Sequence, residues 1–179
     1  IDIAQSYGAE VPFKRPKELA EDDTLDLPVF VHCLNFLYDH DGYEPDIIVQ
    51  LRPTSPLRTI DMIEEGIRLL FDHPEADSVK SVSPPQQHPY RVFRINHEGY
   101  LDPIMCNEHP KPYVLRRQEL PQMYYYNCVI DVTRYVTIND KKSMTGNHIL
   151  PYLMNENDVI DIDTFRDLQI AKTLYEDCK

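Results

Sequence analysis

Hydrophobic residues recur along the chain in two patterns, one with helical spacing and one typical of extended strands. Apolar positions three and four residues apart predict helices over residues 1–7, 26–38, 59–71 and 165–175. Short apolar or alternating runs predict strands over residues 9–13, 46–51, 76–82, 127–132, 148–154 and 159–163. The run over 46–51 is almost continuously apolar, which is typical of a strand covered on both faces.

The order of these elements predicts a three-layer α/β fold. Strand–helix–strand alternation produces a mostly parallel sheet with helices on both faces. Ligands bind to such sheets beyond the carboxyl ends of the strands. We expect two segments at that edge, the rigid loop over 52–58 with its two prolines and the acidic run over 159–163.

The acidic run is the clearest candidate for chemistry. If residues 159–163 form a strand, Asp161 and Asp163 share one face while the isoleucines beside them point into the core. Two adjacent carboxylates repel each other unless a cation lies between them, and a hard divalent ion, Mg²⁺ first, suits such ligands. The alternative is that Asp163 and Asp167 complement the dipole of the next helix while Asp161 is solvated. Thr164, three residues before Asp167, predicts a capping box there.

Residues 84–126 differ in character from the rest of the chain. Seven prolines and many aromatic residues crowd this segment, and helical periodicity is absent. A small hairpin is predicted over 91–101, around the turn sequence Asn96-His97-Glu98-Gly99. We interpret the segment as an excursion from one domain of residues 1–179, used as a lid or for contact with a partner subunit.

Composition limits the class of protein. A chain of 179 residues, 42% hydrophobic and 27% charged, is expected to form one soluble globular domain. The net charge of −12 argues against a nucleic-acid-binding surface, which would need a basic patch. No apolar run approaches the length needed to cross a bilayer, and the first residues do not resemble a signal peptide.

Cysteine and glycine positions exclude several kinds of site. The cysteines have no Cys-x-x-Cys pair, so reduced thiols in a cytoplasmic protein are expected rather than disulfides or a zinc site. The five glycines are well separated, which excludes a Walker loop and a dinucleotide fingerprint within this chain. The four cysteines are Cys33, Cys106, Cys128 and Cys178.

Several short motifs together resemble the acylneuraminate cytidylyltransferases, or CMP-sialic acid synthetases. Each motif alone is weak, but all of them occur in the family's order across nearly the whole chain. They are Arg15-Pro16-x-Glu18-Leu19-Ala20-x-Asp22-x-Thr24, Leu51-Arg52-Pro53-Thr54-Ser55-Pro56-Leu57-Arg58, Asp77-Ser78-Val79 with Ser81-Val82, Arg117-Gln118-x-Leu120-Pro121, Asn127, and Asp161-Ile162-Asp163-Thr164.

The resemblance implies a nucleotide-diphosphosugar-transferase-like (Rossmann-like) fold and a homodimer whose inserted segment, about 84–126, reaches the neighbouring subunit. It implies transfer of CMP from CTP to the anomeric hydroxyl of a nine-carbon acidic sugar, with release of pyrophosphate. By position, Asp161 and Asp163 would hold the catalytic Mg²⁺ and Arg117 would contact the sugar acid. The further substrate-contacting residues implied are Arg15, Arg52, Thr54, Ser55, Arg58, Arg91, Gln118 and Asn127.

The chain departs from the family pattern at three positions near the implied acceptor pocket. Arg52 replaces the usual Gln, and Cys128 and Asp131 replace the Gly and Tyr of an Asn-Gly-x-x-Tyr strand. A negative Asp131 suits an acidic sugar poorly unless it is paired, and Arg52 and Arg134 are the partners expected from the sequence. The acceptor is therefore expected to be a variant nonulosonic acid and not N-acetylneuraminate itself. The alternative acceptors are sugars of legionaminate, pseudaminate or Kdo type.

Family members open with a strand and a glycine- and lysine-rich loop around the nucleotide triphosphate, and this chain begins after that loop. The resemblance therefore suggests an N-terminally incomplete enzyme, which would be inactive without the loop, or a divergent form that has lost it. The alternative function is a non-catalytic relative that binds a nucleotide sugar or dimerises with an intact paralogue.

Overall fold

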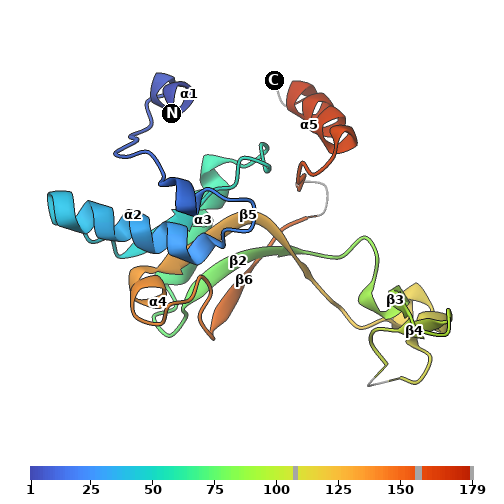
Figure 1. Ribbon diagram of the computed structural model, residues 1–179. Helices are drawn as coiled ribbons and strands as arrows, with labels where there is room; N and C mark the ends of the chain where they lie inside the picture. Colours follow the sequence, from blue (N-terminus) through green and yellow to red (C-terminus); the bar gives the residue numbers. More distant parts are fainter. Residues whose placement is uncertain (107–108, 156–158, 178–179) are drawn as a thin grey trace.

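The computed structural model describes residues 1–106, 109–155 and 159–177 (Figure 1). In chain order the elements are α1 (Asp2–Ser6), η1 (Lys17–Leu19), α2 (Asp26–Asp41), β1 (Ile47–Gln50), α3 (Ile60–Phe71), β2 (Ser78–Ser83), η2 (Pro89–Arg91), β3 (Phe93–Ile95), β4 (Leu101–Pro103), η3 (Pro112–Val114), η4 (Arg117–Glu119), β5 (Tyr125–Arg134), α4 (Tyr135–Asn139), β6 (Ile149–Leu153) and α5 (Phe165–Asp177), where η denotes a 3₁₀ helix.

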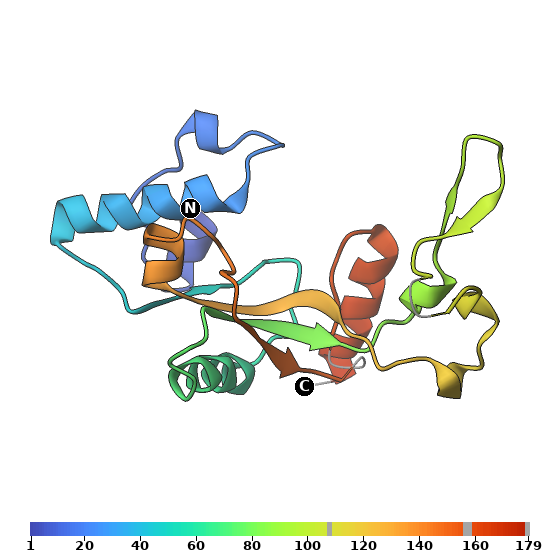
Figure 2. The same cartoon turned by 90° about the horizontal axis from the view of Figure 1, so that it is seen from below.

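The central sheet has four strands in the order β1-β5-β2-β6. β2 and β6 pair in parallel, and β5 lies antiparallel between β1 and β2, so three of the four strands run in one direction. Helix α3 covers one face of the sheet, and α2 and α4 lie over the other (Figures 1 and 2). The expected α/β fold with a mostly parallel sheet is therefore confirmed.

The hydrophobic core lies between α3 and the sheet. Leu70 of α3 and Val79, Ile130 and Val132 of the two central strands are fully buried there. Gly66 brings the helix close to β5, because a Cβ at this position would lie only 2.8 Å from Cγ2 of Ile130. A larger residue at position 66 would push the helix off the strand that fills the core.

The two faces of the sheet differ in polarity because neighbouring residues of a strand point to opposite sides. Val132 of β5 is in register with Val49 of β1 and Val79 of β2, and this row packs toward α3. The next row consists of Gln50, Asp131 and Lys80, again across β1, β5 and β2. The opposite face therefore carries a polar row at the centre of the sheet.

Helix ends follow the local sequence signals. Gly42 ends α2 in the left-handed conformation, with φ of 63°. At the start of α5 the backbone N–H of Thr164 donates to Oδ2 of Asp167 at 2.7 Å, and the N–H of Asp167 donates to the Thr164 hydroxyl at 3.3 Å. The expected capping box is thus confirmed.

None of the helices in the described residues is long and apolar enough to span a membrane.

Three strand predictions fail in whole or in part. Residues 9–13 and 159–163 are irregular, because neither segment has a neighbouring strand with which it could form a ladder. The second segment instead forms a single backbone bond, from the N–H of Ile162 to the carbonyl of Thr54 at 2.9 Å. β1 lies at an edge of the sheet and is half-buried throughout, rather than covered on both faces.

Residues 84–124 leave the end of β2 and return at the start of β5 as a lobe that projects away from the sheet (Figure 1). Its hairpin of β3 and β4 confirms the prediction over 91–101, and the side chain of Asn96 accepts hydrogen bonds from the N–H groups of Glu98 and Tyr100. His88 joins the two limbs of the lobe, since its Nε2 lies 2.9 Å from the carbonyl oxygen of Pro121.

A buried carboxylate fastens the loop before β6 to the start of β2. Asp77 is 4% exposed and accepts hydrogen bonds from the N–H groups of Asn147 at 2.8 Å and His148 at 3.1 Å, as well as from Lys141. Lys141 and these N–H groups hold the pKa of Asp77 well below its usual value. Gly146 is needed beside it, because a Cβ there would lie 2.3 Å from Cβ of Asp77.

We expect Asp77→Asn to lower the free energy of unfolding at pH 7 by about 2 kcal/mol, because Lys141 and two N–H groups lose a charged acceptor. A depressed pKa stabilises the fold above the unfolded-state value of 3.8, and this stabilisation is lost as the pH falls below it. Urea unfolding between pH 3 and 7 should therefore show the two proteins converging at low pH. The exposed Glu75→Gln serves as control, and a gap that stayed constant down to pH 3 would contradict this role of Asp77.

Candidate active site at the carboxyl ends of the strands

Three cavities lie where β1 and β2 end and β5 begins, and the first two of them share lining residues. The first, of about 400 Å³, contains Asp161 and lies against the start of the projecting lobe. Its volume falls within the range of small-molecule sites. Its lining residues are Pro85, Gln86, Gln87, Tyr125, Val159, Ile160, Asp161 and Asp167.

The segment that contains Asp161 is held by the proline-containing loop after β1, through the bond from Ile162 to Thr54. Arg58 fixes that loop in turn. Its Nη2 donates to the carbonyl of Arg52 at 3.0 Å and its Nε to the carbonyl of Val129 at 2.6 Å. Through these bonds Arg58 positions the loop from β5, and the substrate contact that the resemblance implied for it stays a prediction.

Asp161 and Asp163 lie in different surroundings. Oδ1 of Asp161 is buried and forms no hydrogen bond with the residues that the structure describes, whereas Asp163 is exposed. The strand-face geometry expected for this pair is wrong, because the segment is not a strand. A buried carboxylate oxygen without a donor nevertheless suits a hard cation, which completes its shell with water and phosphate oxygens. The described residues include no cluster of three or more His, Cys, Asp or Glu side chains for a metal enclosed by protein.

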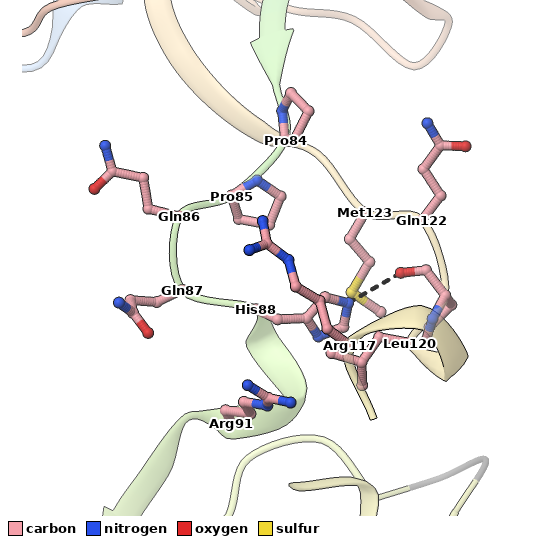
Figure 3. A pocket seen from close by; sticks show the side chains of 11 residues that line it. Pro84, Pro85, Gln86, Gln87, His88, Arg91, Arg117, Leu120, Gln122 and Met123 are labelled. Atoms are coloured by element: carbon pink, nitrogen blue, oxygen red, sulfur yellow. Dashed lines mark hydrogen bonds between the residues drawn. The ribbon is translucent and has the colours of Figure 1, made fainter. Parts of the chain in front are cut away.

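The second cavity, of about 290 Å³, shares Pro85, Gln86 and Gln87 with the first. It brings together Arg91 and Arg117, which the sequence analysis assigned to the acidic sugar (Figure 3). Figure 3 shows Arg117 extending from η4 toward Pro85 and Gln87, with Arg91 below it on η2. None of the described residues that line this cavity is acidic. The cavity therefore carries uncompensated positive charge.

The third cavity, of about 490 Å³, opens on the polar face of the sheet. Arg52 donates from Nη2 to Oδ2 of Asp26 at 2.9 Å. Burial alone would lower the pKa of Arg52, but its contacts with Tyr126 and Asp26 outweigh burial and raise it. Nζ of Lys80 lies 3.2 Å from Oδ1 of Asp131. Both cations of this cavity are thus paired with a carboxylate.

The partners expected for Asp131 are wrong. Its carboxylate is 1% exposed and binds Lys80 and the Tyr126 hydroxyl, not Arg52 or Arg134. Arg134 instead donates to three backbone carbonyls near the end of α3. Burial and the Asp131 carboxylate together raise the pKa of Tyr126, so its hydroxyl stays protonated and donates to that carboxylate.

Asn127 lies inside the sheet, and it is not among the described residues that line the three cavities. It is 2% exposed, and its Oδ1 accepts a hydrogen bond from the Ser81 hydroxyl at 2.5 Å. Its Nδ2 donates to the Ser83 hydroxyl at 3.1 Å. The side chain therefore joins β5 to β2, and its implied role at the acceptor pocket stays a prediction.

Other residues implied by the resemblance are dispersed. Arg15 is exposed in the irregular segment before η1, and Gln118 is exposed on η4 beside Arg117. Thr54 is half-buried, and its carbonyl holds Ile162. Ser55 is 3% exposed, so the loop buries this hydroxyl.

Four residues that line the third cavity were not predicted from the sequence: Asp26, Gln50, Lys80 and Tyr126. One signal was available in the sequence. Lys80 lies within the strand predicted over 76–82, and a lysine in a buried strand requires a carboxylate partner. Its pairing with Asp131, 51 positions later, depends on the order of the strands and could not be read from local pattern.

Curated relatives resemble nearly the whole chain. It is 30% identical to CMP-N,N'-diacetyllegionaminic acid synthase of Legionella pneumophila over 98% of this chain and 73% of that protein. It is 28% identical to N-acylneuraminate cytidylyltransferase of Streptococcus agalactiae over 91% of this chain, but spans only 37% of that longer relative. Pseudaminic acid cytidylyltransferase of Campylobacter jejuni is 25% identical over 98% of this chain and 73% of its own length. No family model matches the chain.

Solved structures share the fold at low sequence identity. CMP:2-keto-3-deoxy-manno-octonic acid synthetase, in a structure complexed with CTP, aligns with 99% of this chain and 77% of its own at a TM-score of 0.65 and 13% identity. The 4-diphosphocytidyl-2C-methyl-D-erythritol synthase of Anaerococcus prevotii aligns with 98% of this chain and 74% of its own at a TM-score of 0.58 and 12% identity.

Cys128 lies on β5 in a conformation that disfavours a side chain, with φ of 61°. We expect Cys128→Gly to raise the free energy of unfolding by about 1 kcal/mol, because glycine adopts this conformation without strain. The same substitution at Cys33, inside helix α2, should instead lower it by about 1 kcal/mol or more. Equal losses for both variants in denaturant titrations would show that Cys128 is not strained.

Proposed function

Because the chain belongs to the family of cytidylyltransferases that includes CMP-N,N'-diacetyllegionaminic acid synthase, we propose that it transfers CMP from CTP to a sialic-acid-like nonulosonic acid. The observation that best supports this proposal is that the cavity of Asp161 adjoins a second cavity. The second cavity is lined by two arginines and by no acidic residue among those described. An acidic cavity that can bind metal suits a triphosphate, and an adjoining basic cavity suits a sugar acid.

The reaction joins the anomeric hydroxyl oxygen of the sugar to the α-phosphorus of CTP and breaks the bond to pyrophosphate, and the hydroxyl proton passes to solvent. Such a transfer needs positioning and charge neutralisation more than a protein nucleophile. The guanidinium groups of Arg91 and Arg117 are suited to the sugar carboxylate, because each offers several N–H donors in a fixed fork.

We propose that Asp161, with Asp163 nearby in sequence, holds Mg²⁺. The buried Oδ1 of Asp161 supports this role, because it faces no donor among the described residues. Bound there, the metal would offset the charge that develops on the phosphates. The protein's own contribution is to fix Asp161 through the bond of Ile162 to the rigid loop at Thr54.

We propose a homodimer formed through the projecting lobe. The lobe exposes several large apolar side chains, including Ile95 at 74%, Leu101 at 63% and Val114 at 64%. A set of apolar side chains of this size on one lobe is typical of an interaction surface. We propose that the reaction takes place in the cytoplasm, because the widely separated cysteines, with no Cys-x-x-Cys pair, fit reduced thiols.

The proposed reaction predicts that the full-length protein releases pyrophosphate only when CTP, Mg²⁺ and a nonulosonic acid are all present. The assay compares the four nucleoside triphosphates across a panel of sialic, legionaminic, pseudaminic and Kdo-type acids. Asp161→Asn should reduce turnover by at least about a hundredfold, because metal stabilisation of phosphoryl charge is worth several kcal/mol. The exposed Asp72→Asn is the matched control.

Thermal unfolding separates metal binding from catalysis. Mg²⁺ with CTP should raise the melting temperature of the wild type and of Asp72→Asn, and this increase should vanish in Asp161→Asn while the unliganded fold is preserved. An increase that persists in Asp161→Asn, or turnover equal to that of the control, would remove Asp161 from the metal site.

The dimer proposal predicts a mass of twice the 21.0 kDa chain by light scattering at micromolar concentration. Leu101→Lys with Val114→Lys should shift the protein toward monomer, because two charges would enter an apolar interface. The exposed Lys17→Met is a control that should leave the mass unchanged. A monomer in the unmodified protein would contradict the proposal.

A further inference from the structure

The two arginines proposed to bind the sugar carboxylate lie on separate limbs of the projecting lobe. Arg91 ends η2 on the outgoing limb, which follows β2, and Arg117 begins η4 on the returning limb, which leads into β5. The ladder between β2 and β5 ends at Ser83 and Tyr125, so the main sheet does not hold these limbs together. Both arginines are exposed, and their relative position therefore depends on contacts inside the lobe.

Hydrogen bonds connect the two limbs on either side of Arg117. Nε2 of His88 lies 2.9 Å from the carbonyl oxygen of Pro121, a contact that Figure 3 marks with a dashed line. Nη2 of Arg91 donates to the carbonyl of Leu115 at 3.1 Å. The two acceptors lie two residues before and four residues after Arg117. The backbone that carries Arg117 is thus attached to the outgoing limb on both sides.

The two connections differ in how substrate binding affects them. Arg91 is itself assigned to the sugar carboxylate, so a bound substrate competes with the carbonyl of Leu115 for its guanidinium. The bond from His88 to Pro121 uses a half-buried side chain to which the proposed reaction gives no contact with substrate. This second bond can therefore hold the limbs together while the cavity is occupied.

The ring of His88 is held through both of its nitrogens. A backbone carbonyl can only accept, so Nε2 carries the proton and donates to Pro121. The N–H of Tyr90 can only donate and lies 3.2 Å from Nδ1, which therefore accepts. The ring also packs edge-on against that of Tyr90, which is 5% exposed, with the centroids 5.2 Å apart. A neutral imidazole in one orientation thus joins the start of η2 to the chain that follows η4.

The neutral state of His88 suits the cavity that it lines with the two arginines, a cavity of about 290 Å³. None of the described lining residues is acidic, so no carboxylate offsets the repulsion between the guanidinium groups of Arg91 and Arg117. A link between the limbs must therefore oppose this repulsion without adding charge to the cavity. The imidazole of His88 meets both conditions.

We propose that His88 is a positioning residue for the acceptor, and that its bond to Pro121 holds the limbs at the spacing at which Arg91 and Arg117 bind one carboxylate together. The inference rests on the proposed function, because it concerns the acid that these arginines would bind. His88 acts through the arginines and does not touch the reacting atoms. A carboxylate has two oxygens, and a guanidinium from each limb reaches them only when the limbs are correctly spaced.

Substitutions of different length separate the two hydrogen bonds of His88. His88→Gln can place an amide N–H where Nε2 lies, which keeps the bond to Pro121, whereas His88→Asn can place an amide oxygen where Nδ1 lies, which keeps the bond from Tyr90. We expect His88→Asn to raise the KM for the acid about tenfold and His88→Gln to raise it by about threefold or less. In both variants kcat and the KM for CTP should stay within about twofold of the wild type.

A second comparison tests whether His88 acts through Arg117. His88→Ala should raise the KM for the acid about tenfold in the otherwise unmodified protein, but about threefold or less when Arg117→Ala is already present, because the arginine to be positioned is then missing. His148→Gln, at an exposed histidine outside the lobe, is the control and should leave every kinetic parameter unchanged. Melting temperatures of all variants show that they fold.

A loss of acid affinity that is larger in His88→Asn than in His88→Gln, together with the coupling to Arg117→Ala, would establish the inference. Equal losses in His88→Asn and His88→Gln, or a rise in KM that is the same for the acid and for CTP, would overturn it, because general damage to the fold affects both substrates. If His88→Ala does not fold, the comparison of the two amide variants decides the question. No pyrophosphate release by the wild type with CTP and any acid would instead overturn the proposed function.

Discussion

The hydrogen bonds of the Asn127 side chain determine the shape of the whole site. In the pairing of β5 with β2, Asp131 lies opposite Lys80 and Tyr126 lies opposite Val82. Between these two pairs β5 advances by five residues, whereas β2 advances by only two. The extra residues on β5 bulge at Cys128, and Asn127 closes the bulge by bonding to Ser81 and Ser83. Residues five apart on a regular strand point to opposite faces. The bulge places Tyr126 and Asp131 on the same face, where they bind each other.

The bulge also explains how the site separates charge. On the side of the bulge toward the end of β5, Lys80 and Asp131 lie opposite each other in the sheet and form an ion pair, so their charges cancel. Beyond it, β2 and β5 diverge into the projecting lobe, where Arg91 and Arg117 lie on separate 3₁₀ helices and share no carboxylate. A buried ion pair contributes little net stability, but it can specify what a site accepts. The two arginines whose cavity has no acidic residue among its described lining thus lie on the lobe, whereas Arg52 and Lys80 on the polar face of the sheet are each paired with a carboxylate.

Local signals in the sequence predicted the elements whose stability is local. The capping box of Thr164 and Asp167 determines the start of α5 through neighbouring residues. Pairing across the sheet could not be predicted in the same way. Residues 159–163 have the alternation of a strand, but a strand requires a neighbour, and the parallel partner of β2 is β6. The partner of Asp131 likewise depended on strand order, because Lys80 becomes adjacent only when β5 lies beside β2.

The absence of a ladder at Asp161 suits the role proposed for it. A strand residue has its direction fixed by the pleat, and its side chain would stand perpendicular to the sheet. Ile162 is instead attached to the sheet by its single bond to Thr54, on a loop that two prolines stiffen and Arg58 ties to β5. The capping box of α5 fixes the other side of the segment within two residues. The acidic segment is thus held at both ends and free of sheet geometry between them, so Asp161 can turn its carboxylate into the cavity rather than along a strand face.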